Sequence, residues 1–293
     1  MKVLVTGANG QLGWEMKLQS LKYDFHIEAF DKTILDITDC LTLRTILNEI
    51  NPDIIVNTAA YTSVDQAEHN RDQAYKVNHL GVKNLAEICQ EKSILLIHIS
   101  TDYVFNGLKG EAYNEKDETC PINIYGDSKL KGEQEIRSLW DKHIIIRTSW
   151  VFGVHGHNFI KTILNLIRTN KDIKIVDDQY GCPTSARSLA ECIYKICIKY
   201  SKHQEIEYGT FHFTNTPSTS WYLFAKDIIK FAYKYKLVED LRDIESISGE
   251  EYESQADRPI DSSLSSNKIF NSFNISDSEW KEELELTISK LSN

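Results

Sequence analysis

Residues 3–13 read Val3-Leu4-Val5-Thr6-Gly7-Ala8-Asn9-Gly10-Gln11-Leu12-Gly13, a short apolar strand that enters a tight turn and then a helix. Gly7 permits the turn, Gly10 leaves room for a pyrophosphate, and Gly13 lets the helix pack close to the strand. Exposed N–H groups and the helix dipole favour phosphate there. A turn of purely structural purpose is the alternative, but a strand before the turn and a helix after it favour dinucleotide binding.

Outward from this turn, short apolar runs alternate with helical patterns. Strands are predicted at residues 26–30, 54–57, 94–100 and 143–148, and helices at 11–20, 41–50, 72–91 and 123–139. Strands that are apolar throughout and separated by helices indicate a parallel sheet covered on both faces. The fold class predicted is therefore α/β, a Rossmann-type doubly wound parallel sheet.

The pattern loosens after Trp150. Helices are predicted at residues 158–170 and 188–200, after a cap at Thr219 or Ser220, and at 276–291 with Ser276 as its cap. Short strands are predicted at 173–176 and 211–213, and 240–266 is polar and irregular. We expect residues 1–150 to form an NAD(P)-binding domain. Residues 151–293 mainly form a smaller C-terminal α/β substrate domain, with some later segments returning to the first.

Composition narrows the classes of partner. The formal net charge of -10 argues against a nucleic-acid binder, because phosphate contact needs clustered Lys and Arg. No run approaches the roughly 18 apolar residues of a membrane span, and the first apolar run is too short for a signal peptide. The six cysteines are scattered without C-x-x-C spacing, which indicates reduced thiols and no zinc. We expect a cytoplasmic protein.

Asp31 ends the second predicted strand, 18 residues after Gly13. An acid at that place can accept hydrogen bonds from the adenosine ribose, and its charge would repel a 2′-phosphate. NADH is therefore slightly favoured over NADPH, although Lys32 can offset the preference. Asp36 and Ile37 come next and could flank the adenine. A plain loop acid is the alternative for Asp31.

Tyr125 and Lys129 are four residues apart, so a helix places both side chains on one face. The ordinary pKa of tyrosine, about 10, is too high for easy proton exchange, and a nearby cation lowers it. Thr101 follows a predicted strand directly, at the sheet edge where α/β sites lie. A chance pair is the alternative in a chain with 14 tyrosines. Together with the glycine turn, the three residues predict a reductase whose proton donor is Tyr125.

These motifs resemble those of the extended short-chain dehydrogenase/reductases. The resemblance covers nearly the whole chain, and the pieces that carry it are residues 7–15, 56–62, 100–105, 121–126, 147–152, 178–181, 183–184 and 258–259. It implies that Gly10, Gln11 and Leu12 hold the pyrophosphate, and that Asp31, Asp36 and Ile37 surround the adenosine. It further implies that Ala60, Tyr61 and Thr62 line the path to the nicotinamide. Thr101, Asp102, Trp150 and Arg258 would contact the sugar, and Lys129 the ribose. Trp150 as ordinary core and Arg258 as a surface residue are the alternatives.

The most similar branch of that family reduces dTDP-linked sugars. The resemblance implies NAD(P)H-dependent reduction of the C4 ketone of dTDP-4-dehydro-β-L-rhamnose to dTDP-β-L-rhamnose. Three alternatives remain open: reduction of another dTDP-4-keto-6-deoxysugar, for example to the 6-deoxy-talose product; an epimerase that retains NAD⁺; and a non-catalytic NAD(P)-binding regulatory subunit.

Some members of the family bind magnesium through carboxylates that include the one matching Glu15, and some relatives dimerise around that metal. In the segment that should supply the other acidic ligands, Arg187 and Glu191 occur instead. The sequence therefore predicts no metal site, and it leaves open whether the protein needs magnesium or forms a homodimer.

Overall fold

Six parallel strands form the main sheet of the computed structural model, which describes residues 1–169, 172–276 and 278–292. Along the sheet their order is β2 (His26–Phe30), β1 (Lys2–Thr6), β3 (Ile54–Asn57), β4 (Leu95–Thr101), β5 (His143–Thr148) and β10 (Gly209–His212). The direction of strand addition reverses between β1 and β3. All carboxyl ends meet at one edge, where ligands of such sheets bind. The predicted doubly wound α/β fold is confirmed.

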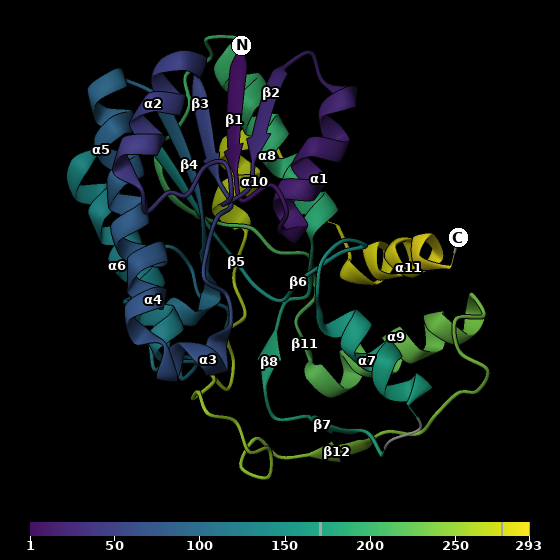
Figure 1. Cartoon of the computed structure of the whole chain (residues 1–293). Coiled ribbons are helices and arrows are strands. Elements are labelled where there is room, and N and C mark those ends of the chain that lie inside the picture. The colour runs from purple at the N-terminus through teal and green to yellow at the C-terminus, as the bar shows by residue number, and fades with distance from the viewer. Residues whose placement is uncertain (170–171, 277, 293) are drawn as a thin grey trace.

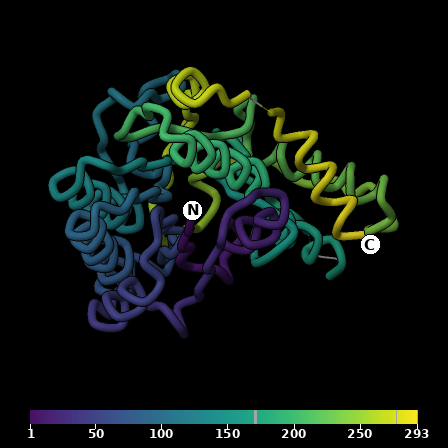
Figure 2. Tube along the Cα trace, turned by 90° about the horizontal axis from the view of Figure 1, so that it is seen from above, coloured from purple at the N-terminus to yellow at the C-terminus, as the bar shows by residue number. Residues whose placement is uncertain are grey.

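Helices cover both faces of the sheet (Figures 1 and 2). One layer contains α2 (Cys40–Ile50), α5 (Val82–Lys92) and α6 (Ile124–Leu139), and the other contains α1 (Gln11–Gln19), α8 (Ala186–Ser201) and α10 (Asn267–Phe273). In β1, Leu4 packs into the first layer, whereas Val3 and Val5 pack into the second. Strands buried on both faces explain the apolar runs in the sequence.

The second lobe lies below the carboxyl edge of the sheet in Figure 1. Its apolar core joins α7 (Phe159–Arg168), α9 (Trp221–Lys234) and α11 (Trp280–Leu291). Paired short strands complete it: β6 (Val151–Phe152) with β9 (Thr184–Ser185), β7 (Lys174–Val176) with β12 (Glu245–Ile247), and β8 (Tyr180–Gly181) with β11 (Thr219–Ser220). The expected division at residue 150 remains a prediction. The structure has two apolar cores, but α8, β10 and α10, which follow residue 150, lie against the main sheet.

Most predicted elements occur within a residue or two of their expected bounds, and Ser220 caps α9 by accepting from the N–H of Leu223 at 3.2 Å. The long helix expected at 72–91 is broken into α4 (Arg71–Tyr75), the π-helical turn η2 (Lys76–Gly81) and α5. Four short helices were not predicted: α3 (Val64–His69), α10, and the 3-10 turns η1 (Ser20–Lys22) and η3 (Asp102–Val104).

The prediction that Ser276 caps the last helix is wrong. The helix α11 begins at Trp280 with Glu279 as its N-cap residue. The backbone before it is tied to the segment after β10, because Thr216 N–H donates to Ser278 O at 3.2 Å and Trp280 N–H donates to Thr216 O at 3.0 Å. Among the residues that the structure describes, no helix is long and apolar enough to cross a bilayer.

Candidate functional site

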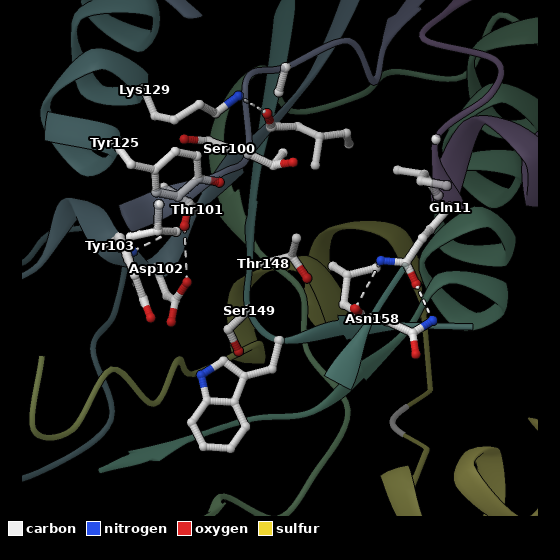
Figure 3. A pocket seen from close by; sticks show the side chains of 18 of the residues that line it. Gln11, Ser100, Thr101, Asp102, Tyr103, Tyr125, Lys129, Thr148, Ser149 and Asn158 are labelled. Atoms are coloured by element: carbon white, nitrogen blue, oxygen red, sulfur yellow. Dashed lines mark hydrogen bonds between the residues drawn. The ribbon is translucent and has the colours of Figure 1, made fainter. Parts of the chain in front are cut away.

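A cavity of about 850 Å³ opens at the carboxyl edge of the sheet, between the two lobes. Its walls come from the glycine turn, from the segments that follow β3, β4 and β5, and from α6 and α9. Figure 3 shows Tyr125, Thr101 and Asp102 on one side and Gln11 and Asn158 on the other. Thr148 lies between them, and its buried hydroxyl finds no hydrogen-bond partner within the described chain. A buried polar atom of this kind points to a ligand.

The glycine turn has the backbone geometry that its spacing predicted. Gly7 has φ +69°, and a Cβ on Gly13 would stand 2.4 Å from Gly7 O, so both positions require glycine. Gly10 is the N-cap residue of α1, and no side chain caps that helix. The N–H groups of its first turn therefore remain available at the cavity wall, which fits a pyrophosphate.

The second lobe is fastened to this turn through Gln11. Its Nε2 donates to Val151 O at 3.1 Å, and its Oε1 accepts from Asn158 Nδ2 at 3.0 Å (Figure 3). The ring of His155 stacks on Trp14 with ring centroids 5.1 Å apart. The segment around residues 153–158 thus covers one end of the cavity.

Tyr125 stands in the first turn of α6, which begins after the N-cap residue Asn123. A Cβ on Gly126 would lie 2.1 Å from Tyr103 O, so glycine at 126 allows the helix to approach the segment after β4. Burial raises the pKa of Tyr125 to about 12, and a hydrogen bond with the Thr101 hydroxyl opposes that rise. The phenol and the Thr101 hydroxyl are therefore neighbours in one cavity.

Lys129 lies one turn further along α6 and is buried. Its Nζ donates to Ile99 O at 2.6 Å, as Figure 3 shows. Burial lowers the pKa of Lys129 to about 8, although the charge of Glu133 opposes the change. The expected lowering of the Tyr125 pKa by Lys129 stays a prediction, because Thr101 is the group that lowers it here.

Asp102 is a buried carboxyl beside this pair. It accepts from Thr101 Oγ1 at 3.0 Å and from Ser262 Oγ at 2.5 Å. Burial raises its pKa to about 7, against the effect of these hydrogen bonds. Its charged form costs more than that of an ordinary aspartate, so Asp102 can exchange protons near neutral pH.

Two further residues named by the resemblance lie in the wall. Arg258 pairs with Asp65 at 2.7 Å between Nη2 and Oδ2. Trp150 adopts a left-handed backbone with φ 45°, and its ring stacks on Trp221 with centroids 3.5 Å apart. A Cβ on Gly181 would lie 2.5 Å from the Trp150 ring, so this indole is held from both sides.

The structure brings most predicted site residues together, and those that line the cavity are Gly10, Gln11, Leu12, Ala60, Thr62, Thr101, Asp102, Tyr125, Lys129, Trp150 and Arg258. Gly7 and Gly13 shape the turn behind it. Tyr61 is outside the lining, and Asn78 Oδ1 accepts from its N–H at 2.8 Å.

The adenosine residues named by the resemblance lie outside the cavity lining. Asp31 accepts from Asn9 Nδ2 at 2.5 Å and from Thr33 N–H at 2.8 Å, at the end of β2. Asp36 accepts from Thr38 N–H at 2.8 Å, and Ile37 is buried in the apolar core of its layer. Their predicted roles toward adenosine stay predictions.

Several polar residues that support the site were not predicted. Asn78 in η2 holds Tyr61 and also donates to Ser128 Oγ at 3.0 Å. Glu133 accepts from Ser100 Oγ at 2.6 Å, and Ser262 bonds Asp102. Their partners lie between 17 and 160 residues away in the chain, so no local pattern could identify them. The long helical pattern of residues 72–91 gave no sign of the π-helical turn, a feature that often marks functional sites.

The residues around Glu15 do not fit a divalent cation. Glu15 accepts from Gln19 Nε2 at 3.2 Å. The carboxylates of Glu191 and Glu283 both accept from the guanidinium of Arg187, the former at 2.7 Å. A permanent cation therefore already occupies the acidic cluster. Within residues 1–169, 172–276 and 278–292 no three His, Cys, Asp or Glu side chains are grouped to hold a metal ion.

Known proteins resemble this chain over its whole length. The family described as RmlD substrate binding domain matches residues 1–293. A dTDP-4-dehydrorhamnose reductase of Aggregatibacter actinomycetemcomitans is 40% identical over 284 residues, 97% of either chain. The crystal structure of a dTDP-4-dehydrorhamnose reductase from Clostridium acetobutylicum has a TM-score of 0.91 at 37% identity and covers 100% of both chains. That of the Bacillus anthracis enzyme, in complex with NADP, has a TM-score of 0.89 at 40% identity over 99% of both. The chain therefore belongs to the dTDP-4-dehydrorhamnose reductase family.

Proposed function

We propose that this protein reduces the C4 ketone of dTDP-4-dehydro-β-L-rhamnose to dTDP-β-L-rhamnose with NADH or NADPH. The observation that carries the proposal is the meeting of the Tyr125 and Thr101 hydroxyls with Lys129 in one cavity that ends at an uncapped glycine turn. A binding subunit without activity needs none of these three side chains at the cavity. The family to which the chain belongs supplies the substrate class.

Different residues of the cavity would bind the cofactor, bind the sugar and transfer the proton. The first turn of α1, with Gly10, Gln11 and Leu12, would hold the cofactor pyrophosphate, and Lys129 would hold the ribose. When bound, the reduced nicotinamide supplies the hydride. Thr101 would donate a hydrogen bond to the ketone oxygen, and Tyr125 would transfer its proton to that oxygen as charge develops there. Asp102, Trp150 and Arg258 would orient the sugar nucleotide.

The choice between the two cofactors rests on Asp31. Hydrogen bonds from Thr33 and Asn9 keep the pKa of Asp31 below its ordinary value, so this side chain carries a full negative charge at neutral pH. A negative charge at the end of β2 disfavours the 2′-phosphate of NADPH. We therefore expect a modest preference for NADH, although the relative from Bacillus anthracis was crystallised with NADP.

A coupled assay tests the proposal. dTDP-glucose, its dehydratase and its epimerase would generate the keto sugar, and loss of nicotinamide absorbance would report turnover with each cofactor. Product stereochemistry by NMR separates rhamnose from 6-deoxy-talose. Absence of turnover with both cofactors would contradict the proposal, and stoichiometric NAD⁺ in the purified protein would favour an epimerase.

Tyr125→Phe provides the matched variant. It removes the proton that the alkoxide needs but keeps the ring, so kcat should fall at least about a hundredfold. NADH affinity, followed by fluorescence titration, should remain near that of the wild type. Full activity in the folded variant would exclude Tyr125 as the proton donor.

A further inference from the structure

His98 lies in the middle of β4 and is completely buried, in contact with Asn57 of β3 and Lys129 of α6. Its Nδ1 is 2.9 Å from Asn57 Nδ2, and its Nε2 is 3.4 Å from Lys129 Nζ. His98 is thus a buried imidazole that contacts Lys129, and the proposed reaction gives it no role. The question is which ring nitrogen carries the proton.

The orientation of Asn57 answers this question. Its Oδ1 faces the backbone N–H of Ala59 at 3.2 Å, and that group can only donate. The hydroxyl of Thr6 donates to the same oxygen at 2.6 Å. The amide nitrogen of Asn57 must therefore face His98, and it donates to Nδ1. His98 Nδ1 is an acceptor and carries no proton.

The remaining nitrogen holds the proton. Burial, together with the positive charge of Lys129, holds the pKa of His98 well below its ordinary value, so the ring is neutral. A neutral imidazole with an accepting Nδ1 has its hydrogen on Nε2. That N–H points at Lys129 Nζ. An ammonium group has three donors and no lone pair, whereas a neutral amine can accept from Nε2–H.

We propose that His98, held as the Nε2–H tautomer by Asn57, is a positioning residue that disfavours the ammonium form of Lys129. Two titratable groups contact or act on this amine: the charge of Glu133 of α6 favours its ammonium form, and His98 of β4 places Nε2 at 3.4 Å from Nζ. Arg147 of β5 donates to both oxygens of Glu133, at 2.9 and 2.7 Å. This positive charge weakens the stabilisation that Glu133 gives to the ammonium form of Lys129. The Ile99 carbonyl accepts from either form of the amine.

The protonation of Lys129 matters for the supply of the proton that the reaction consumes. The inference rests on the proposed function, in which each turnover consumes one proton delivered through Tyr125. With a pKa of about 8, Lys129 can give a proton and regain it from solvent within the physiological range. A lysine with the ordinary pKa of about 10.4 would hold its proton too tightly to release it in that range. In this proposal His98 and Asn57 add to the effect of burial on Lys129 and so help to set the pH above which Lys129 no longer delivers a proton.

The most direct test observes the nitrogens themselves in the full-length protein. In ¹⁵N-histidine-labelled wild type, His98 should show a protonated Nε2 and an unprotonated Nδ1 from pH 6 to pH 9. The opposite tautomer, or a ring that is charged in this range, would overturn the proposal. This measurement needs neither turnover nor a variant that folds, so it fails independently of the assigned reaction.

His98→Gln tests the effect on Lys129. The glutamine amide can rotate to place its oxygen toward Nζ, so the lysine titration, followed by ¹⁵Nζ NMR with Lys129→Met as the assignment variant, should move up by about one pH unit. The alkaline limb of kcat should move with it. Asn57→Asp should act in the same direction, because a carboxylate facing Nδ1 selects the other tautomer.

His143→Gln is the matched control. It removes another largely buried histidine from the same sheet, at the amino end of β5, where it hydrogen-bonds the Trp140 carbonyl. The Lys129 titration should stay at its wild-type midpoint. An unchanged midpoint in folded His98→Gln, or an equal shift in His143→Gln, would refute the assignment of this role to His98.

Discussion

Asp102 is a residue of the site whose protonation is coupled to the stability of the fold. Burial raises its pKa in the folded protein to about 7, from an ordinary value of 3.8. The folded state therefore binds a proton that the unfolded state releases. The stabilisation is complete below pH 3.8, the ordinary value, and is lost as the pH rises through 7.

Asp102→Asn should remove this pH dependence. Between pH 5 and pH 7 the free energy of unfolding of the wild type should fall by about 1 kcal/mol per pH unit relative to the variant. Urea unfolding at the two pH values gives the difference directly. Parallel pH profiles for the two proteins would show that the Asp102 carboxyl is not perturbed.

Among the elements, α6 carries two of the three side chains that we propose for the reaction, so its start determines where Tyr125 stands. Asn123 Oδ1 accepts from Gly126 N–H at 2.7 Å, and its Nδ2 donates to Asp257 O at 2.8 Å. One side chain therefore caps the helix and ties it to the segment that contains Arg258. Loss of this cap should affect both stability and catalysis.

Asn123→Ala should reduce the free energy of unfolding by about 1 kcal/mol, the usual cost of an N-cap substitution. It should also lower kcat, because the first turn that holds Tyr125 loses its anchor. Ser138→Ala is the control on the same helix, since the exposed Ser138 hydroxyl bonds only the carbonyl of Glu135, at 3.0 Å. Equal stability of the two variants in urea would contradict the capping role.

At the scale of the whole molecule, Arg187 joins the two lobes. It belongs to α8, which packs on the main sheet, and it pairs with Glu283 of α11 in the second lobe. The carboxylate of Glu283 is nearly buried, so it depends on this partner. The pair holds in place a contact between the lobes that enclose the cavity.

Arg187→Met should leave Glu283 without its counter-charge and lower the free energy of unfolding by roughly 2–4 kcal/mol, since one buried partner is stranded.

Because the guanidinium already satisfies the acidic cluster, magnesium or EDTA should leave the Tm of the wild type unchanged. Calorimetry of the wild type and of Arg187→Met, each with and without magnesium, checks both statements. A clear magnesium-dependent rise in the wild-type Tm would contradict the assignment of Arg187 as the resident cation.

The sequence alone determined the main sheet and the candidates for the reacting groups. Glycine at 7 and 13 reports backbone geometry that only glycine tolerates, and apolar strands between helices indicate a sheet buried on both faces. The four-residue spacing of Tyr125 and Lys129 is likewise a local property. Such features are fixed by residues close together in the chain, and so they can be read from it.

Only the tertiary structure decided how these groups are tuned. The contact of His98 with Asn57 and Lys129, and that of Asp102 with Ser262, join segments between 31 and 160 residues apart. Burial, which shifts the pKa of Lys129 down and that of Asp102 up, arises when two lobes and several strand ends close around the same space. Desolvation depends on everything that surrounds a group, and no local pattern of residues records it.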